Sequence, residues 1–338
     1  MSVEGFSQQW RDFPDYIIGV TEEIWEKRGV ETLERSYAPD IPVRTPMGIT
    51  RGNRPVIAST MATLHEFPDR QLFGEDVIWC GDAEAGFLSS HRILSTATHA
   101  ADGAFGPATG RRFQVRIIAD CAAREDTIYD EWLVRDYGGI VRQLGLDPRV
   151  YAATLIEREG GPERCSKPFT PDVDEAGEYR SAGNADERGE CYASIVTRLM
   201  NGEFDLVPEH YDRAVQVEYP GAVSGLSHDA VSRFWLGLRS AFPTAEFRIH
   251  HRIGMPGGML SPRAALRWSL DGVHEGWGTF GEPSGATVHV MGMAHAEFGP
   301  FVERGSVRDT SIRREFVLYD EVAIWKQILM QRPAFAAP

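Results

Sequence analysis

The sequence predicts two tandem α+β domains, each with a strongly bent, mostly antiparallel sheet wrapped around helices. Two observations predict this class. Each half reads as helices, then strands, then a last helix. The chain also repeats itself, because His99 to Gly110 and His274 to Gly285 share the histidine, three glycines and a phenylalanine in register at an offset of 175. A period this long indicates a duplicated domain, since solenoid repeats are about 20–50 residues long.

The repeat extends over most of each half. Residues 67–68 and 242–243 are both Phe-Pro and keep the offset of 175. Residues 131–136 match residues 315–320 at an offset of 184. The larger offset predicts an insertion of about nine residues in the second copy, within Phe298 to Arg308.

The first half is expected to begin with helices. Apolar residues recur at helical spacing from Tyr16 onward, and prolines and glycine over 39–48 predict turns. We expect further helices over 30–37 and 53–67, strands over 76–80, 86–99, 112–121 and 127–134, and a closing helix over 136–144. The second half repeats this order, with helices over 192–200, 204–211 and 228–242, then strands, then a helix over 320–329.

These elements predict the domain limits. The first domain is expected over 1–150, a linker over 151–188 and the second domain over 189–332. Residues 160–189 contain glycines, prolines and charges with little apolar periodicity, so they are either a linker or an ordered loop. Helices followed by a bent sheet favour a cone with an apolar pocket inside.

Composition narrows the ligand classes. The chain has 338 residues, is 42% hydrophobic and carries a net charge of −14. Binding of nucleic acid or an anionic membrane surface needs a basic footprint, so both are excluded. No apolar run approaches the ~20 residues of a membrane span. The four cysteines form no CxxC or zinc pattern, and residues 1–16 do not resemble a signal peptide, so we expect a cytoplasmic protein with reduced thiols.

The repeated motif resembles a known family. His-x3-Gly-x-Phe-Gly, then Thr/Ser-Gly and a strand, then Trp-x3-Asp before a last helix, is similar to the SnoaL-like polyketide cyclases of the nuclear-transport-factor-2-like superfamily. This resemblance implies a cone in each half and an intramolecular aldol closure that uses no metal or cofactor. The same cone also hosts isomerases, lyases and non-catalytic binding proteins, so function depends on the site.

The resemblance also implies site residues. An aspartate at the Trp-x3-Asp position acts as general acid/base in these cyclases, which carries over to Asp136 and, in the second half, to Asp320. Phe316 replaces the tryptophan in the second half, so we expect the first half to be the active one. The alternative is structural, because an aspartate just before a helix is also a typical N-cap worth ~1 kcal/mol.

The alternation of side chains along the strands indicates which histidines could assist Asp136 as polar partners. His91 and His99 share one strand face, and the matching face of the second half, which ends at His274, is apolar. These histidines are therefore expected to point inward, either into a cavity or into a satisfied core position. Glu131 has the parity opposite to Trp132, which predicts a solvated or interface position.

Aromatic and histidine side chains are expected to line the two pockets, although such spacing is also typical of a core. The candidates are Trp132, Trp79, Tyr16 and His65 in the first half, and Trp268 and Trp277 in the second. The remaining histidines lack metal-ligand spacing, so no metal site is expected.

We therefore expect a cofactor-independent acid/base enzyme of the aldol cyclase, isomerase or lyase type. It would act on a small hydrophobic carbonyl or hydroxy compound, with Asp136 as base and His99 and His91 as polar partners. The alternative is a non-catalytic small-molecule-binding protein of the same fold. The duplication predicts a pseudo-dimer within one chain, which can assemble further into a homodimer.

Overall fold

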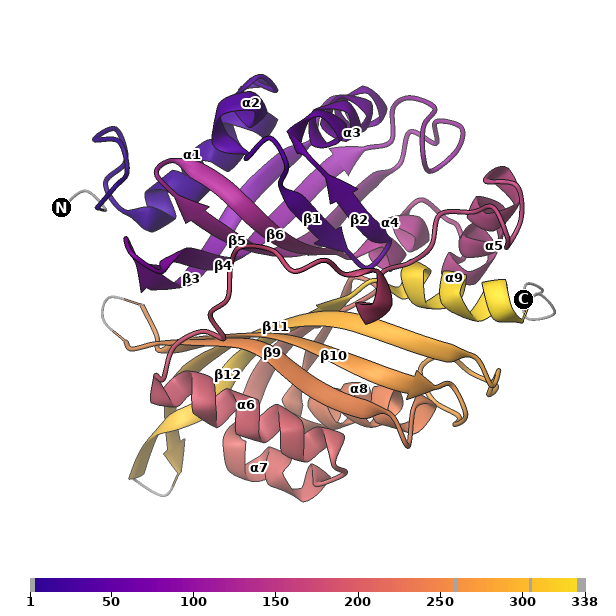
Figure 1. Ribbon diagram of the computed structural model, residues 1–338. Coiled ribbons are helices and arrows are strands. Elements are labelled where there is room, and N and C mark those ends of the chain that lie inside the picture. The colour runs from indigo at the N-terminus through magenta and orange to yellow at the C-terminus, as the bar shows by residue number, and fades with distance from the viewer. Residues whose placement is uncertain (1–3, 258–259, 304–305, 333–338) are drawn as a thin grey trace.

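The computed structural model describes residues 4–257, 260–303 and 306–332, and it contains two six-stranded sheets (Figure 1). The strand orders are β2-β1-β6-β5-β4-β3 and β8-β7-β12-β11-β10-β9. Neighbouring strands are antiparallel in both sheets, except that β1 is parallel to β6 and β7 is parallel to β12. The identical order confirms the predicted class of two tandem α+β domains.

The first half follows the expected order of elements. Its elements are α1 (Phe13–Trp25), α2 (Thr32–Ser36), β1 (Pro42–Thr45), β2 (Gly48–Arg51), α3 (Asn53–Glu66), β3 (Gln71–Asp82), β4 (Gly86–Thr98), β5 (Arg112–Arg124), β6 (Thr127–Arg135) and α4 (Tyr137–Gln143). The expectation of turns over 39–48 is only partly correct. This region also forms the β1–β2 hairpin, whose four-residue strands are too short to show an alternating pattern.

The second half repeats these elements. They are α6 (Glu187–Met200), a 3₁₀ turn (Phe204–Leu206), α7 (Val207–His210), β7 (Tyr211–Tyr219), β8 (Val223–Leu226), α8 (Ser227–Ala241), β9 (Glu246–Met255), β10 (Arg263–Val273), β11 (Thr287–Glu303), β12 (Ser306–Tyr319) and α9 (Glu321–Gln331). β11 and β12 have 17 and 14 residues, compared with 13 and 9 in β5 and β6. The predicted insertion therefore lengthens this hairpin, and residues 304–305 lie outside the described residues.

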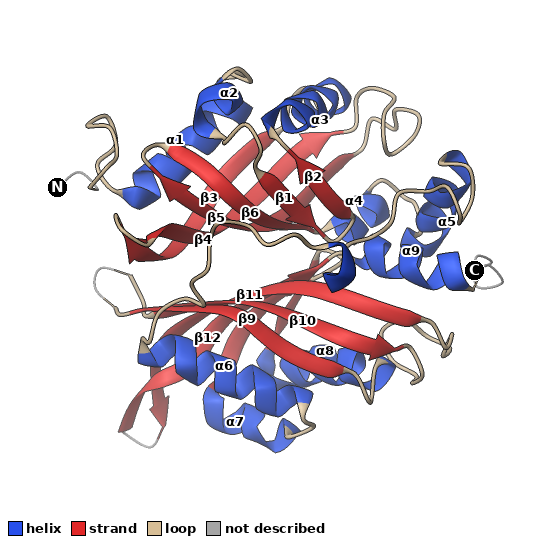
Figure 2. Ribbon diagram, in the orientation of Figure 1, coloured by secondary structure: helices blue, strands red, loops and turns tan. Residues whose placement is uncertain are grey.

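Helix α1 shows how the sequence builds the cone. Asp12 caps the helix by accepting a hydrogen bond from the Asp15 backbone N–H. Ile17, Val20 and Ile24 then recur on one face and are buried against the inner face of the first sheet. The helix therefore closes the cone from above, as Figure 2 shows.

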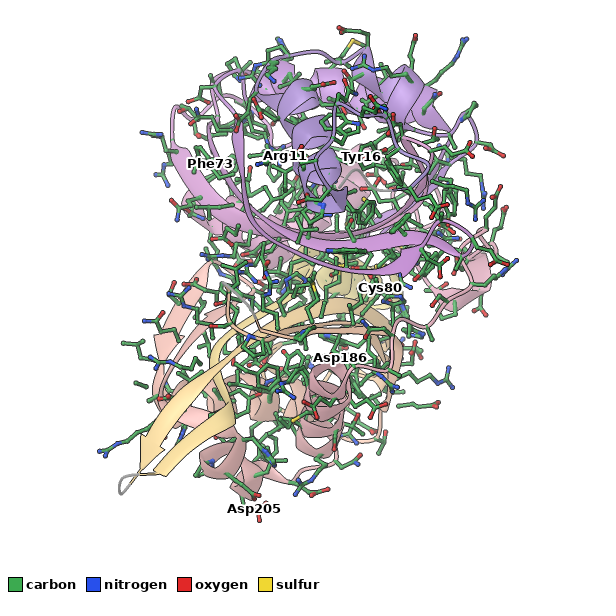
Figure 3. All side chains as sticks on the ribbon, turned by 90° about the vertical axis from the view of Figure 1, so that its left-hand side faces the viewer. Arg11, Tyr16, Phe73, Cys80, Asp186 and Asp205 are labelled. Atoms are coloured by element: carbon green, nitrogen blue, oxygen red, sulfur yellow. The ribbon has the colours of Figure 1, made fainter. Side chains whose placement is uncertain are left out.

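The two sheets pack back to back. Helices α1–α3 cover the face of the first sheet that points away from the second half, and α6–α8 cover the corresponding face of the other sheet (Figures 1 and 2). In the side view of Figure 3, Tyr16 lies among the helices of the first half, whereas Cys80 lies on the opposite side of the sheet, towards the second half. Both faces of each sheet are therefore buried, one in a cone and one between the halves.

The contact between the sheets has pseudo-twofold symmetry. The Arg92 guanidinium lies 3.5 Å from the centre of the Phe316 ring, and the Arg267 guanidinium lies 3.6 Å from that of Trp132. These four residues occupy equivalent positions in the two copies. Each arginine thus stacks on the aromatic residue of the opposite half, a cation–π contact.

The polar partners of these arginines follow the same symmetry. Arg267 forms an ion pair with Asp120 at 3.5 Å, and Arg92 donates to Nδ1 of His295 at 3.3 Å. Asp120 and His295 are themselves equivalent positions, and both are buried between the sheets. The duplicated chain therefore reproduces the interface of a twofold dimer within one molecule.

The segment between the halves is ordered and lies along the interface (Figure 1). It begins after α5 (Pro148–Arg158), which packs against α9 of the second half. Asp174 then accepts from Nε of Arg44 at 2.5 Å, and the Tyr179 hydroxyl hydrogen-bonds to Nε2 of His251 at 2.9 Å.

Candidate active site

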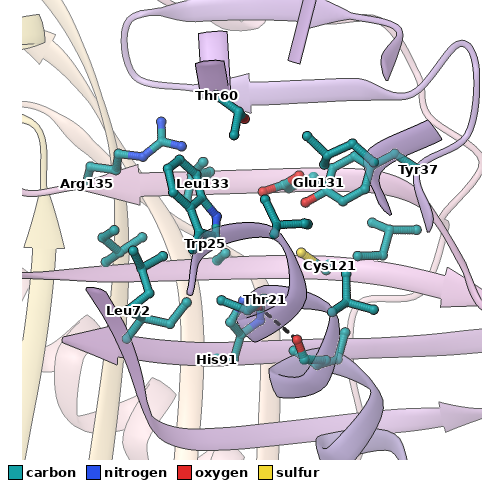
Figure 4. A pocket seen from close by; sticks show the side chains of 18 of the residues that line it. Thr21, Trp25, Tyr37, Thr60, Leu72, His91, Cys121, Glu131, Leu133 and Arg135 are labelled. Atoms are coloured by element: carbon teal, nitrogen blue, oxygen red, sulfur yellow. Dashed lines mark hydrogen bonds between the residues drawn. The ribbon is translucent and has the colours of Figure 1, made fainter. Parts of the chain in front are cut away.

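A cavity of about 80 Å³ lies inside the first cone, between α1 and the inner face of the sheet (Figure 4). Most of its lining is apolar and comes from α1 and from strands β3 to β6. Five polar side chains of larger size also line it, namely Tyr37, Arg70, His91, Glu131 and Arg135. An apolar cavity with a few convergent polar groups is the usual form of a small-molecule site.

Glu131 is the acidic group of this cavity. It lies on β6, opposite Val43 of β1, and its side chain is buried. Burial raises the pKa of Glu131 to about 7, while the Arg135 charge and a hydrogen bond from the Tyr37 hydroxyl act in the opposite direction. Figure 4 shows Tyr37 beside this carboxyl. Glu131 therefore titrates near neutral pH, as a general base requires.

The position of Glu131 corrects the interpretation of strand parity. Glu131 and Trp132 do lie on opposite faces of β6, but Glu131 faces the cavity and Trp132 faces the second half. The expectation that Glu131 lies on a solvated or interface face is therefore wrong. Because both faces of the sheet are buried, the apolar character of Trp132 did not identify the cone side.

His91 lies on β4, two strands from Glu131 on the same inner face of the sheet, and it also lines the cavity. Its Nδ1 hydrogen-bonds to the Ser89 hydroxyl at 3.1 Å. Burial lowers the pKa of His91 to about 4, so the imidazole is neutral at pH 7. A neutral imidazole whose Nδ1 is already engaged can present Nε2 to a ligand.

The equivalent space in the second cone is filled by side chains. Glu315, the counterpart of Glu131, accepts hydrogen bonds from the hydroxyls of Tyr192 (3.0 Å), Tyr211 (2.7 Å) and Tyr219 (2.6 Å), and from Nε1 of Trp235 (3.3 Å). Its carboxylate is fully buried and has no free position for a ligand. Within the described residues, the polar cavity around this glutamate position is thus a feature of the first half.

Three substitutions between the copies distinguish the filled second cone from the open cavity of the first. Trp235 stands where the first half has Thr60, and Tyr192 stands where it has Ile17. Leu266 replaces His91. The larger aromatic side chains occupy the volume that is open in the first half, and the imidazole is lost.

Asp136 does not line this cavity. It caps α4 by accepting from the Gly139 N–H at 2.8 Å, and it also accepts from the N–H groups of Gly221 (2.9 Å) and Ala222 (2.7 Å) in the second half. Its two carboxylate oxygens are therefore engaged by three backbone donors. The structure places Asp136 as a helix cap and a contact between the halves, and does not bring it together with His91.

Asp320 caps α9 in the equivalent way. Its Oδ1 accepts from the N–H groups of Val322 (2.9 Å) and Ala323 (3.3 Å), whereas its Oδ2 is buried without a hydrogen-bond partner among the described residues. Burial raises the pKa of Asp320 to about 8. Both aspartates of the family-like motif therefore begin helices.

His99 and His274 each close the same loop. The backbone N–H and C=O of His99 bond to Arg111 and Gly110, and those of His274 bond to the equivalent residues of the second half, all at 2.9 Å. Nδ1 of His99 hydrogen-bonds to the Thr109 hydroxyl at 3.1 Å, and Nδ1 of His274 to the Ser284 hydroxyl at 3.0 Å. Neither histidine lines the cavity. The repeated motif that identifies the duplication thus organises a loop.

The other residues expected to line the pockets lie outside this cavity. Tyr16 and Trp79 pack in the core of the first cone without lining the cavity, and His65 is exposed on α3. Trp132 and Trp268 line a separate cavity of about 200 Å³ between the halves. Trp277 is 68% exposed.

Four polar residues of the cavity were not among the predicted site residues, namely Glu131, Tyr37, Arg70 and Arg135. Glu131 carried a usable signal, because it recurs as Glu315 in the repeated block. Arg70 carried none, since it lies between elements and has no strand parity.

Metal sites and membrane-spanning helices are not found in the described part of the chain. Across residues 4–257, 260–303 and 306–332, no group of three or more His, Cys, Asp or Glu side chains is arranged to hold a metal ion. No helix over these same ranges has the length and apolar character needed to cross a membrane.

Several solved structures resemble one half of this chain. IdmH of Streptomyces antibioticus, described as a candidate polyketide cyclase, is 25% identical, and the match covers 39% of this chain and 98% of IdmH with a TM-score of 0.35. TsrD of Streptomyces laurentii is 21% identical over 38% of this chain and 95% of its own, with a TM-score of 0.34. A SnoaL-like polyketide cyclase of Agrobacterium tumefaciens is 19% identical over 42% and 97%, with a TM-score of 0.30.

Each of these matches covers about two fifths of this chain and more than nine tenths of the solved structure. No protein-family model matches the sequence, and no curated protein is similar to it.

Proposed function

We propose that the first half is a cofactor-independent acid/base enzyme that removes a proton from carbon next to a carbonyl group. Glu131 is the base and His91 is the polar partner. The observation that carries this proposal is the buried Glu131 carboxyl, whose pKa is about 7 and which faces a cavity that the neutral imidazole of His91 also lines. Groups with perturbed pKa values in a cleft are candidates for such roles.

Each group has a defined task in this reaction. The deprotonated Glu131 accepts the proton from the α carbon of the substrate, and Tyr37 holds the carboxyl in place by its hydrogen bond. Negative charge then moves to the carbonyl oxygen. The imidazole of His91 donates a hydrogen bond from Nε2 to that oxygen, while Nδ1 remains bonded to Ser89. The apolar wall strengthens both interactions because it excludes water.

The fate of the enolate decides which reaction the enzyme carries out. Reprotonation at another carbon gives an isomerase, attack of the enolate on a second carbonyl gives an aldol closure, and loss of a β-hydroxyl gives a lyase. All three share the first step. Ketosteroid isomerase, which uses an aspartate base in an apolar site, shows that a carboxylate suffices for such a step.

The test measures the shared first step directly. Exchange of α protons for deuterium is followed by NMR in D₂O with two small probes, acetone and pyruvate. We expect exchange with at least one probe, and a loss of about 10²-fold or more in Glu131→Gln, on the order of what general base catalysis contributes.

The filled second half offers a matched control. Glu315→Gln makes the same change at the equivalent position and is expected to retain exchange, because Glu315 has no access to a ligand. Exchange that survives Glu131→Gln but is lost in Asp136→Asn would return the base to the position implied by the family resemblance. Binding of a probe without exchange in the unmodified protein would favour the alternative of a non-catalytic binding protein.

A further inference from the structure

Two guanidinium groups line the cavity without forming a close ion pair, although the charge of Arg135 does act on the Glu131 carboxyl. Arg70 and Arg135 both line it, and they are close enough that the charge of Arg135 acts on Arg70. Within the described part of the chain, no carboxylate oxygen lies within 4.0 Å of a nitrogen of either residue. This is unusual in a chain with 49 acidic and 35 basic side chains, in which most buried arginines are paired.

Arg70 is held rigidly. Its side chain is buried, its Nε donates to the Ser95 hydroxyl at 3.1 Å, and its guanidinium lies 4.9 Å from the centre of the Trp25 ring. Burial lowers the pKa of Arg70 to about 9, so the group still carries its charge at pH 7. A buried cation normally has an anionic partner, because leaving water without one costs free energy.

Folding of the cone does not require these charges. At the position of Arg70 the second half has Ala245, and the same backbone turn is present, with N–H to C=O distances of 3.1 Å from residue 70 to Phe67 and 3.2 Å from residue 245 to Phe242. At the position of Arg135 the second half has Tyr319. Both arginines are therefore absent from the half whose cone is filled.

We propose that the substrate of this site is a small oxo or hydroxy acid whose carboxylate is bound between Arg70 and Arg135. This inference rests on the proposed function and names its substrate class. Paired guanidinium groups recognise a carboxylate through parallel N–H donors, which gives both affinity and orientation. The ligand is thus charged, unlike the small hydrophobic compound that the sequence favoured.

The charges of the site balance through the reaction. Before proton transfer, two arginines and one glutamate carry a net charge of +1, which the substrate carboxylate neutralises. When Glu131 accepts the α proton it becomes neutral, and the substrate becomes a dianion of enolate and carboxylate. The two positive charges of Arg70 and Arg135 then match the two negative charges of the substrate.

The cavity also limits the size of the substrate. Its volume of about 80 Å³ is far below the roughly 300–1,000 Å³ of pockets for drug-sized ligands. We therefore expect acids of a few heavy atoms, such as pyruvate, and not a polycyclic compound.

The experiment compares pyruvate with pyruvamide, which has nearly the same shape and no charge. Binding to the full chain is measured by isothermal titration calorimetry and by the fluorescence of Trp25, which lines the cavity. We expect pyruvate to bind at least about 10-fold more tightly than pyruvamide, as charge-assisted pairing with arginine provides. Arg70→Met and Arg135→Met should each remove this preference, whereas Arg54→Met, the same change at an exposed position on α3, should leave it intact.

The outcomes separate this inference from the proposed function. Glu131→Gln should still bind pyruvate, because the carboxylate site does not need the base. Tight binding of pyruvate without α-proton exchange therefore supports the carboxylate site and counts against the enzyme. Exchange of acetone with no preference for pyruvate supports the enzyme and overturns the carboxylate site.

Further results would also overturn the inference. These are a preference for pyruvate that survives both arginine variants, failure of short 2-oxo, 3-oxo and hydroxy acids to bind, and displacement of pyruvate by an equal concentration of inorganic phosphate. If Arg70→Met does not fold, Arg70→Lys and the less buried Arg135→Met carry the comparison, and Arg70→Lys is expected to weaken binding less than the loss of charge in Arg135→Met.

Discussion

At the scale of single residues, two glutamates at equivalent positions show how surroundings set chemistry. Glu131 and Glu315 occupy matching positions on β6 and β12, and burial raises the pKa of both. Glu315 receives four hydrogen bonds from protein groups, so it serves as a structural acceptor. Glu131 receives one from Tyr37 and otherwise faces an open cavity. A buried carboxylate can act on a ligand only where protein groups leave some of its hydrogen-bonding positions free.

This difference predicts that the rate of pyruvate proton exchange rises with pH through the neutral range. The rate should rise through about pH 7, because Glu131 must lose its proton to act as base. The other titratable groups facing the cavity are Arg70, Arg135, Tyr37, Cys121 and His91, and the pKa of His91 lies near 4, below this window. A rise centred near pH 4 would contradict the assignment of Glu131, and rates measured by NMR across the acidic and neutral range distinguish the two outcomes.

At the scale of elements, the sequence predicted order and type better than it predicted the face that each strand presents. The long period and the helical spacing of α1 identified the halves, and the same residues are found in the elements expected. The parity of β6 separated Glu131 from Trp132 correctly. It could not tell which of them faces the cone, because the other face of the sheet is buried as well, between the halves.

The candidate site shows the same limit. His91 was found from strand alternation, whereas Arg70 and Tyr37 lie outside strands and reach the cavity only through the folding of the chain. His99 and Asp136 were the most visible residues in the sequence because they recur. In the structure, recurrence reflects a loop and a helix start that both copies need to fold.

The start of α9 predicts a measurable pH dependence of stability. The folded pKa of Asp320 is about 8, above its ordinary value of 3.8, so the folded state binds more protons than the unfolded state between these values. The free energy of unfolding should therefore decrease as pH rises from about 4 to 8. Asp320→Asn keeps an oxygen acceptor for the helix cap and removes the titration. Urea unfolding should show this variant to be the more stable protein at the alkaline end of this range, with a smaller difference at the acidic end, and a parallel pH dependence of the two proteins would contradict the assignment.

At the scale of the whole molecule, the two halves are held together by reciprocal contacts. Arg92 stacks on Phe316 and Arg267 stacks on Trp132, so each sheet contributes one cation and one ring. Asp136 adds a contact that connects the first half to the backbone of Gly221 and Ala222. Stability of the halves is therefore expected to be coupled.

The cap at Asp136 gives a test of this coupling. Asp136→Ala removes a helix cap worth ~1 kcal/mol and leaves two N–H groups of the other half unpaired at ~1–3 kcal/mol each. We expect a loss of about 3–7 kcal/mol in the free energy of unfolding, measured by urea denaturation. Asp147→Ala, which removes only the exposed cap of α5, should cost ~1 kcal/mol. A melting temperature within a few degrees of the unmodified protein, together with lost turnover, would instead support a catalytic role for Asp136.

The covalent joining of the two copies has a consequence for how such a protein can change over evolutionary time. In an assembly of two identical subunits, a mutation that fills the cavity fills it in both subunits, so neither subunit can bind a ligand there. When the copies share one polypeptide, one of them can exchange its cavity for packing, as Trp235 and Tyr192 do here, while the other keeps its cavity. The filled copy then contributes a packed sheet that stays in contact with the other copy across the interface.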